Sequence, residues 1–263
     1  MEILVCAKRV PDTSENEIEL NAVGNDIERD DLVYSINEPD NYAVEEALQI
    51  VGRVGGNVTV VTVGGNDDEE ILRREMAMGA KHGVLISDEA FSESDGRGIA
   101  TVLKAYIQKN HFDLILTGVQ AEDGAAQVGG MLAALLDYPF ASLVNSIEVL
   151  EGGKLKVSRE IAGGNKEMNE IDLPCVLSIQ TGINEPRYVG MKGIRQVASV
   201  PIPTLGVSDL GIDAGALGKA GAKVKRMDYF VPAAGKGAEM LKGAREENVD
   251  KLIELLKAKG GLQ

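Results

Sequence analysis

Short apolar segments alternate with amphipathic segments through the first half of the chain, and this alternation limits the possible folds more than any other feature. The apolar segments are continuous runs, as expected of strands that are covered on both faces. The segments between them place apolar residues at helical spacing. This rhythm predicts an α/β fold with a doubly wound, mostly parallel sheet and right-handed crossovers. The expected strands are 2–8, 57–63, 83–87 and 112–116, and the expected helices are 41–51, 66–79, 94–107 and 128–136.

The alternation of strands and helices stops after residue 140, where strand-like segments follow one another without helices between them. Short turns that contain glycine separate some of these segments, which favours antiparallel pairing of neighbours. We expect them to add hairpin strands to the same sheet. The segments are 141–150, 154–161, 167–173 and 175–181.

The C-terminal part differs in composition from the rest of the chain. Residues 201–243 are rich in Gly, Ala and Pro and have weak periodicity, which is typical of an arm that needs a partner for order. A last amphipathic helix carries Val249, Leu252, Ile253 and Leu256 on one face. The expected division is an α/β nucleotide-binding domain, 1–200, followed by a C-terminal arm and helix, 201–263.

Composition excludes several classes of function. The formal net charge is −14, so the surface repels nucleic acid and anionic lipid. Aromatic residues are only 4% with no Trp, which disfavours base-stacking platforms. No apolar run approaches the roughly 20 residues of a membrane helix, so no membrane insertion is expected. The two cysteines, Cys6 and Cys175, lie in apolar runs and are interpreted as free thiols in a reducing, cytoplasmic environment.

Residues 187–226 depart from this acidic character, because they hold seven basic and two acidic side chains. A basic stretch on an acidic protein is a candidate docking face for an acidic partner. A solvated loop is the alternative interpretation.

The residues that usually carry catalysis are scarce. The chain has two histidines, and neither has a metal ligand at usable spacing, so no metal site and no Ser-His-Asp triad is predicted. Acidic pairs such as Glu45–Glu46 are expected on solvated helix faces. We therefore predict no catalytic residue, which favours a binding or carrier role. The alternative is a free-standing adenylating enzyme on the same kind of sheet, which would turn over ATP as a monomer.

A nucleotide site is expected past the carboxyl ends of the strands, where ligands bind in open parallel sheets. Segments 6–9, 63–65 and 118–130 reach this edge. The last of them enters a helix through small residues, and the free N–H groups of a helix start attract phosphate. Neither a Walker lysine nor a G-x-G-x-x-G pattern is present. A mononucleotide held by backbone donors therefore fits better than a hydrolysed triphosphate.

Collinear motifs between residues 3 and 188 point to one family. They read I-L-V-C-A-K-R-V-P-D-T (3–13), N-E-P-D-N-Y-A-V-E-E-A (37–47), A-M-G-A (77–80), Q-A-E-D with Q-V-G (120–123 and 127–129), L-D-Y-P (136–139), S-R-E-I with G-G (158–161 and 163–164) and N-E-P-R-Y (184–188). Together these motifs resemble the beta subunit of electron transfer flavoproteins.

The resemblance implies an electron carrier subunit of a heterodimer with an adenine-nucleotide-hydrolase-like sheet. In this family the alpha subunit holds most of the FAD site, and the beta subunit supports that flavin and binds AMP structurally. The flavin accepts electrons from flavin-containing dehydrogenases, such as acyl-CoA dehydrogenases. It passes them to a quinone-reducing oxidoreductase or another acceptor. The resemblance also implies that the arm, 201–263, packs on the alpha subunit.

By position, the resemblance places the AMP pocket at the strand ends and in the phosphate loop. The implied contacts come from the ends of two strands, from the N-E-P-D turn and from residues 120–131. The residues are Cys6, Asn37, Glu38, Pro39, Asp40, Val63, Gln120, Asp123, Gly124, Ala125, Ala126, Gln127, Val128, Gly129, Gly130 and Met131.

The segment 184–200 resembles the recognition loop with which this family docks on dehydrogenases. Its apolar anchor falls on Met191, where the family usually has Leu, and Met is as apolar and more adaptable. An apolar knob with a basic rim suits a promiscuous, transient contact. The implied docking residues are Arg187, Tyr188, Met191, Lys192, Ile194 and Arg195.

Two departures from the family pattern bear on the identity of the nucleotide. The phosphate loop of the family commonly reads Q-x-x-D-x-D-x-x-Q-x-G, whereas residues 120–129 are one residue shorter and lack the second Asp. A branch that bifurcates electrons from NADH and binds a second FAD in place of AMP shows D-R-A-F-x-G-x-D-T and G-D-T-A-Q-V-G-P. Residues 88–96 and 124–130 echo both and lack the Thr of each. AMP is the expected ligand, and a second FAD is the alternative.

Overall fold

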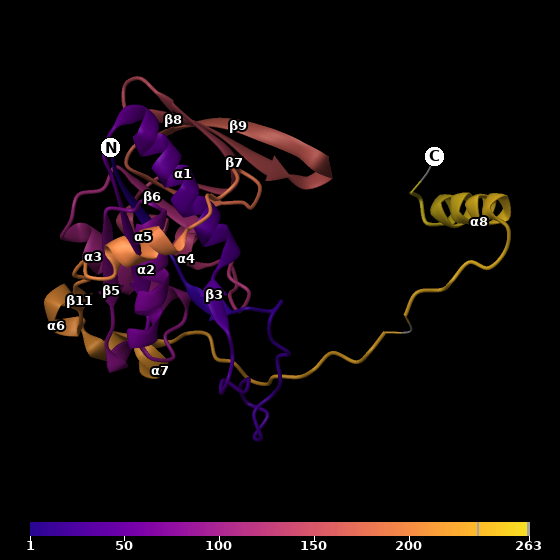
Figure 1. Ribbon diagram of the computed structural model, residues 1–263, viewed down its shortest axis with the longest axis horizontal. Coiled ribbons are helices and arrows are strands. Elements are labelled where there is room, and N and C mark those ends of the chain that lie inside the picture. Colours follow the sequence, from indigo (N-terminus) through magenta and orange to yellow (C-terminus); the bar gives the residue numbers. More distant parts are fainter. Residues whose placement is uncertain (236, 262–263) are drawn as a thin grey trace. The chain divides into compact units, whose positions relative to one another are not determined.

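A computed structural model describes residues 1–235 and 237–261 (Figure 1). The chain divides into two units. The first consists of Met1–Glu19 and Arg29–Met227, and the second of Leu20–Glu28 and the described residues from Asp228 onward. The first unit contains the sheet and every predicted site residue.

A mostly parallel sheet of nine strands forms the centre of the first unit, with the order β11-β5-β4-β1-β6-β10-β7-β8-β9. The strands from β11 to β7 pair in parallel, whereas β8 and β9 continue the sheet in antiparallel pairs. The strands are β1 (Glu2–Cys6), β4 (Asn57–Val63), β5 (His82–Ile86), β6 (Leu114–Gly118), β7 (Phe140–Leu150), β8 (Lys154–Ile161), β9 (Asn165–Asp172), β10 (Cys175–Ile179) and β11 (Thr204–Leu205), with β2 (Arg9–Pro11) and β3 (Tyr34–Ile36) as a separate antiparallel pair.

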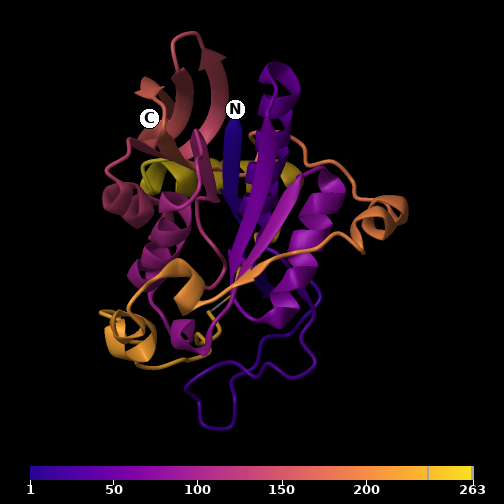
Figure 2. The ribbon, with the colours of Figure 1, turned by 90° about the vertical axis from the view of Figure 1, so that its left-hand side faces the viewer.

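Helices cover both faces of the sheet, as the alternation of segments predicts (Figure 2). Apolar side chains of α1 and α2 pack with Ile3 and Val5 of β1 on one face. Those of α3 and α4 pack with Leu4 and Ile115 on the other. The helices are α1 (Glu38–Val54), α2 (Glu69–Met78), α3 (Gly96–Gln108), α4 (Val128–Leu136), α5 (Met191–Val197), α6 (Val207–Leu210), α7 (Gly218–Gly221) and α8 (Arg245–Ala258), with 3₁₀ turns at Asn66–Asp68, Glu89–Phe91, Ala162–Gly164 and Ala214–Ala216.

Local sequence determines where the long helices begin and end. Pro39 lies in the first turn of α1, where its missing N–H costs nothing. That helix ends at Gly55, whose φ of 81° suits a residue without a side chain. The side chain of Asp95 caps α3 by accepting a 2.9 Å hydrogen bond from the N–H of Gly98. These signals position the strand ends between the helices.

One strand lies elsewhere than expected. The hairpins of β7, β8 and β9 are confirmed, but β10 lies between β6 and β7 and pairs in parallel with both. All five of its residues are buried. A nearly continuous apolar run is typical of a central parallel strand, whereas a hairpin strand with one solvent-exposed face alternates apolar and polar residues.

The first part of the expected arm belongs to the first unit. Thr204–Leu205 forms β11 beside β5, and the side chains of Leu210 and Leu217 are buried in the core. The unit therefore continues to Met227, beyond the boundary expected at residue 200. Because the core itself orders this part, a need for a partner remains a prediction only for what we call the distal arm, residues 228–235 and 237–261.

The distal arm contains one helix of its own, α8. None of its residues is buried, and its apolar side chains Val249, Leu252 and Ile253 are 38–49% exposed. Across the described residues, no helix is both long and apolar enough to cross a bilayer.

Candidate functional site

The chain reverses its direction of travel across the sheet at β1 and β6. From β1 it proceeds outward through β4 to β5, and then returns to place β6 on the other side of β1. The carboxyl ends of these strands are the position where open α/β sheets bind ligands. The segments expected at this edge are therefore brought together.

The N-E-P-D turn ties the ends of β1 and β6 to each other. The carboxylate of Asp40 accepts 2.8 Å hydrogen bonds from the N–H groups of Lys8 and Gly118, one on each oxygen. The amide of Asn37 donates to the carbonyl of Gln120 at 3.0 Å. A Cβ at Gly118 would lie 2.2 Å from Asp40 Oδ1, so only glycine allows this approach. Asn37 and Asp40 are buried and serve the backbone, while Glu38 stays exposed.

The carboxyl group of Asp40 titrates near neutral pH. Its burial raises the pKa to about 7, although hydrogen bonds from Asn37, Lys8 and Gly118 oppose the rise. Burial, with the nearby Asp40 carboxylate, also raises the pKa of the Cys6 thiol. Cys6 is a free, half-buried thiol with no thiolate character, consistent with packing rather than nucleophilic chemistry.

Four of the predicted nucleotide contacts lie on one face of the sheet. Cys6, Val63, Val128 and Met131 are all partly buried and pack against the apolar core cluster that includes α3 and α4. They come from three different elements, β1, β4 and α4. Apolar side chains beside a helix start suit a planar base with an attached phosphate.

The start of α4 has free donors. Gln127 caps it without a side-chain hydrogen bond, so the N–H groups of its first turn have no acceptor within the helix. Ala126, directly before it, has a left-handed backbone with φ of 54°. A left-handed residue beside a helical one turns successive N–H groups toward one point and forms a concave anion site. This backbone offers N–H donors of the kind that bind an anion.

A glycine of this helix start also serves packing. A Cβ at Gly129 would lie 2.4 Å from Ser178 Oγ and 2.8 Å from Thr117 Oγ1, so glycine is required for α4 to approach β6 and β10. A Cβ at Gly130 would lie 3.5 Å from the ring of Phe140, an ordinary contact, so only Gly129 is required by the packing. The absence of a side chain at Gly129 therefore has a structural reason that is independent of phosphate binding.

Two cations that sequence reasoning did not assign lie at this edge, Lys8 and Arg9. The ammonium of Lys8 forms an ion pair with the carboxylate of Asp123 in the phosphate loop. The guanidinium of Arg9 lies 3.9 Å from the centre of the Tyr34 ring and 3.9 Å from Asp68 Oδ1. The sequence could have indicated both residues, because they directly follow the first strand and the end of that strand faces the phosphate loop.

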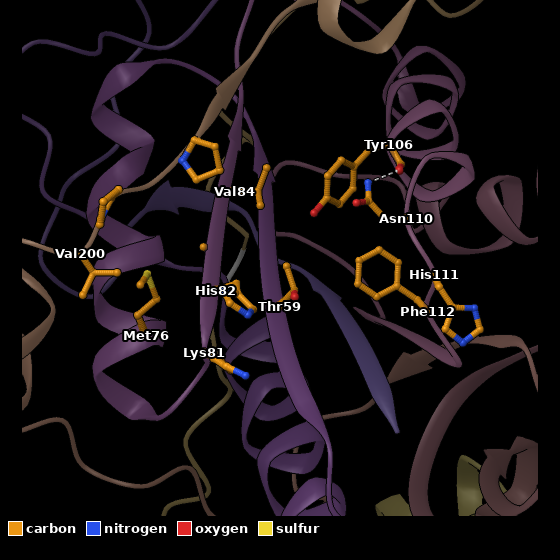
Figure 3. Close-up of a pocket in the computed structure, with 13 residues that line it drawn as sticks. Thr59, Met76, Lys81, His82, Val84, Tyr106, Asn110, His111, Phe112 and Val200 are labelled. Carbon is orange, nitrogen blue, oxygen red and sulfur yellow. Dashed lines mark hydrogen bonds between the residues drawn. The ribbon is translucent and has the colours of Figure 1, made fainter.

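One cavity in the first unit lies at the opposite end of the sheet. It measures about 340 Å³ and both histidines line it, His82 near Lys81 and Thr59 and His111 beside Phe112 (Figure 3). Several of its polar groups already have partners: Lys81 donates to Asn57, and His111 bonds to Asp113 at 3.1 Å. No cluster of three metal-ligating side chains occurs among the described residues.

The expected docking residues form an exposed apolar group around α5. The exposed fractions are 92% for Tyr188, 66% for Met191 and 39% for Ile194. Lys192 and Arg195 are also exposed. The helix that the sequence did not predict, α5, begins at Met191 itself.

Arg187 is exposed as well, but Glu45 binds its guanidinium with hydrogen bonds of 2.7 and 2.9 Å. The expectation that Glu45 and Glu46 face water is therefore wrong: both are buried. Glu46 accepts a 3.1 Å bond from the amide of Asn184. Burial tends to raise the pKa of Glu45, but the bonds from Arg187 and Gln49 outweigh it and hold the pKa below its usual value. The chain at 184–187 covers α1, which no pattern within the helix could indicate.

Comparison with known proteins identifies relatives over nearly the whole chain. The family described as "Electron transfer flavoprotein domain" matches residues 25–210. An electron transfer flavoprotein subunit beta of Methylophilus methylotrophus is 35% identical over 97% of this chain and 98% of its own length. That of Bacillus subtilis is 34% identical over 98% of both chains. A caffeyl-CoA reductase-Etf complex subunit, CarD, of Acetobacterium woodii is 36% identical over 98% of this chain and 99% of its own length.

Proposed function

Because the chain belongs to the electron transfer flavoprotein family, we propose that it is the beta subunit of a heterodimeric electron carrier. In this role it binds AMP structurally, supports an FAD held mainly by an alpha subunit, and docks flavin-containing dehydrogenases. The flavin supplies the electron chemistry when it is bound. This chain would contribute position and shape. The main support for the proposal is that the carboxyl ends of β1 and β6 and the start of α4 lie at the same edge of the sheet.

AMP is the ligand that this edge supports best. The first turn of α4 and Ala126 would hold the phosphate with backbone N–H groups. Cys6, Val63 and Met131 would contact the adenosine with apolar atoms. Lys8 would balance the phosphate charge. The N-E-P-D turn would keep the two strand ends in register rather than carry the ligand itself.

The backbone of Ala126 gives a direct test of AMP binding. Ala126→Val should lower the AMP retained after purification, because a β-branched side chain disfavours a left-handed backbone. Ala126→Gly should retain AMP, because glycine adopts this conformation freely. The measurement is chromatography of the nucleotides released on denaturing the complex. Equal retention in both variants would remove Ala126 from the phosphate site.

A second candidate is the electron-bifurcating type, in which this chain would hold a second FAD in place of AMP and the complex would oxidise NADH. Its support is the similarity to CarD and to an acryloyl-CoA reductase electron transfer subunit gamma of Anaerotignum propionicum, 33% identical over 98% of this chain. Against it, Asp88 and Asp95 in the echoed motif accept hydrogen bonds from backbone N–H groups. NADH oxidation by the purified complex with two FAD would select this candidate over the first.

Docking is assigned to Met191. Met191→Ala should slow electron transfer from a partner dehydrogenase about tenfold, as loss of a central apolar anchor does. AMP and FAD content should not change, and folding stability should change little because the side chain is 66% exposed. Val54→Ala, an exposed apolar side chain at the end of α1, is the matched control. Equal rates for Met191→Ala and the unmodified protein would contradict the assignment.

The distal arm is proposed to pack on the alpha subunit. Its helix α8 leaves Leu252 and Leu256 exposed at helical spacing, and a partner surface would cover them. A chain that ends after Met227 keeps the whole first unit and should lose co-purification with the alpha subunit. Leu252→Asp should weaken assembly in the full chain, whereas Glu254→Ala should not. Intact assembly of the shortened chain would mean that the arm has another role.

A further inference from the structure

The docking helix α5 is a short, exposed element that three separate contacts hold against the body of the first unit. It lies beside α2, as Figure 1 shows. Seven residues make no stable helix alone, because a helix this short cannot repay its nucleation cost. Its position must therefore come from the side chains that bind it.

Arg73 of α2 binds the C-terminal end of α5. Its Nη1 donates to the carbonyl of Val197 at 2.6 Å and to that of Val200 at 2.9 Å. These carbonyls belong to or follow the last turn, where the helix dipole favours a cation, and the carbonyl of Val197 also accepts a 3.1 Å hydrogen bond from the N–H of Val200. Glu69, one turn earlier in α2, holds the guanidinium through Nε and Nη2 at 2.9 and 2.7 Å.

Two further contacts complete the attachment. At the middle of α5, a Cβ on Gly193 would lie 3.1 Å from the carbonyl oxygen of Ala77, so glycine lets the helix lie flat on α2. On the N-terminal side, Glu45 of α1 holds Arg187 by both its backbone N–H and its guanidinium. With the inner side and both ends fixed, Met191 remains on the outside.

We propose that Arg73, oriented by Glu69, is a positioning residue for electron transfer: it fixes α5 so that Met191 and Ile194 face the partner dehydrogenase in one arrangement. The proposal rests on the proposed docking function of α5. The guanidinium of Arg73 is bound to α5 and Glu69, so Arg73 is expected to act through the placement of α5. A fixed anchor binds without paying the entropy of ordering a loop.

The test uses the complete heterodimer and an acyl-CoA dehydrogenase chosen because it reduces the unmodified dimer. Arg73→Ala should raise the KM for the dimer about tenfold with little change in kcat, because two hydrogen bonds to a charged group are lost. Amide hydrogen exchange should accelerate in residues 191–200 and not in β1 or β4. Arg73→Lys keeps the charge and should recover part of the KM. The matched control Arg74→Ala removes the same charge from the exposed neighbouring position and should leave KM within about twofold.

A double variant separates positioning from general destabilisation. If Arg73 acts through the placement of Met191, then Met191→Ala should raise KM less in the Arg73→Ala background than in the unmodified chain. Independent, multiplying effects would overturn the proposal, as would an unchanged KM in Arg73→Ala while Met191→Ala raises it. An unchanged KM in Met191→Ala alone would instead overturn the docking function on which the proposal rests.

Discussion

Replacing Asp40 with alanine is expected to lower the free energy of unfolding by about 3 kcal/mol and to release AMP from the purified complex. The buried carboxylate is the acceptor for the N–H groups of Lys8 and Gly118, so its removal leaves two partly buried donors without a partner. The ends of β1 and β6 would then separate at the proposed site. Urea unfolding of the purified chain measures the loss, and nucleotide chromatography measures the AMP.

Glu38→Ala is the matched control for Asp40, because it removes a carboxylate from the exposed side of the same first turn of α1. It should cost at most about 1 kcal/mol, the contribution of an acidic side chain to a helix start. A similar small loss for Asp40→Ala would show that the N-E-P-D turn does not hold the strand ends together.

Glu75 should make the protein less stable as the pH rises from 4.5 to about 8. Its side chain is fully buried in α2, and neither carboxylate oxygen has a hydrogen-bond partner. Burial raises its pKa from 4.5 to about 8, with Asp40 and Glu45 adding to the rise and Arg74 opposing it. The folded state therefore holds a proton that the unfolded state releases within this window, so stability falls as the pH rises.

Glu75→Gln removes this titration while keeping the shape. Between pH 5.5 and 8.5, the stability of the variant relative to the unmodified chain should increase by about 3 kcal/mol, at 1.36 kcal/mol per pKa unit. Urea unfolding at both pH values measures the difference. Glu70→Gln, at an exposed position of the same helix, should give no such trend. A flat difference for Glu75→Gln would mean that Glu75 keeps an ordinary pKa in the folded protein.

The parts of the fold that depend on local patterns were predictable from the sequence. Continuous apolar runs and helical spacing identified β1, β4, β5 and β6 with the helices between them, because each pattern reports the burial of its own segment. The pairing of β10 depends on contacts with β6 and β7, far from it in the sequence. Its residues Cys175–Ile179, apolar apart from Ser178, were expected to add a further hairpin strand instead.

The sequence predicted where the candidate site lies better than it predicted what each of its side chains binds. Family motifs suggested residues 37–40 and 120–131 as nucleotide contacts, and the structure joins Asn37 to Gln120 and Asp40 to Gly118, while nucleotide binding stays a prediction. That Asn37 and Asp40 bind backbone groups follows only from the approach of two strands. The burial of Glu45 likewise depends on a segment that begins at Asn184, more than a hundred residues further along the chain.

The account depends on this chain being a nucleotide-binding scaffold for the flavin of another subunit. The most direct test is to purify the chain from its native source and to identify the proteins and nucleotides that accompany it. We predict a second subunit and, on denaturation, equimolar AMP and FAD. A catalytically competent chain that purifies alone, with no second subunit and no adenylate, would contradict the account.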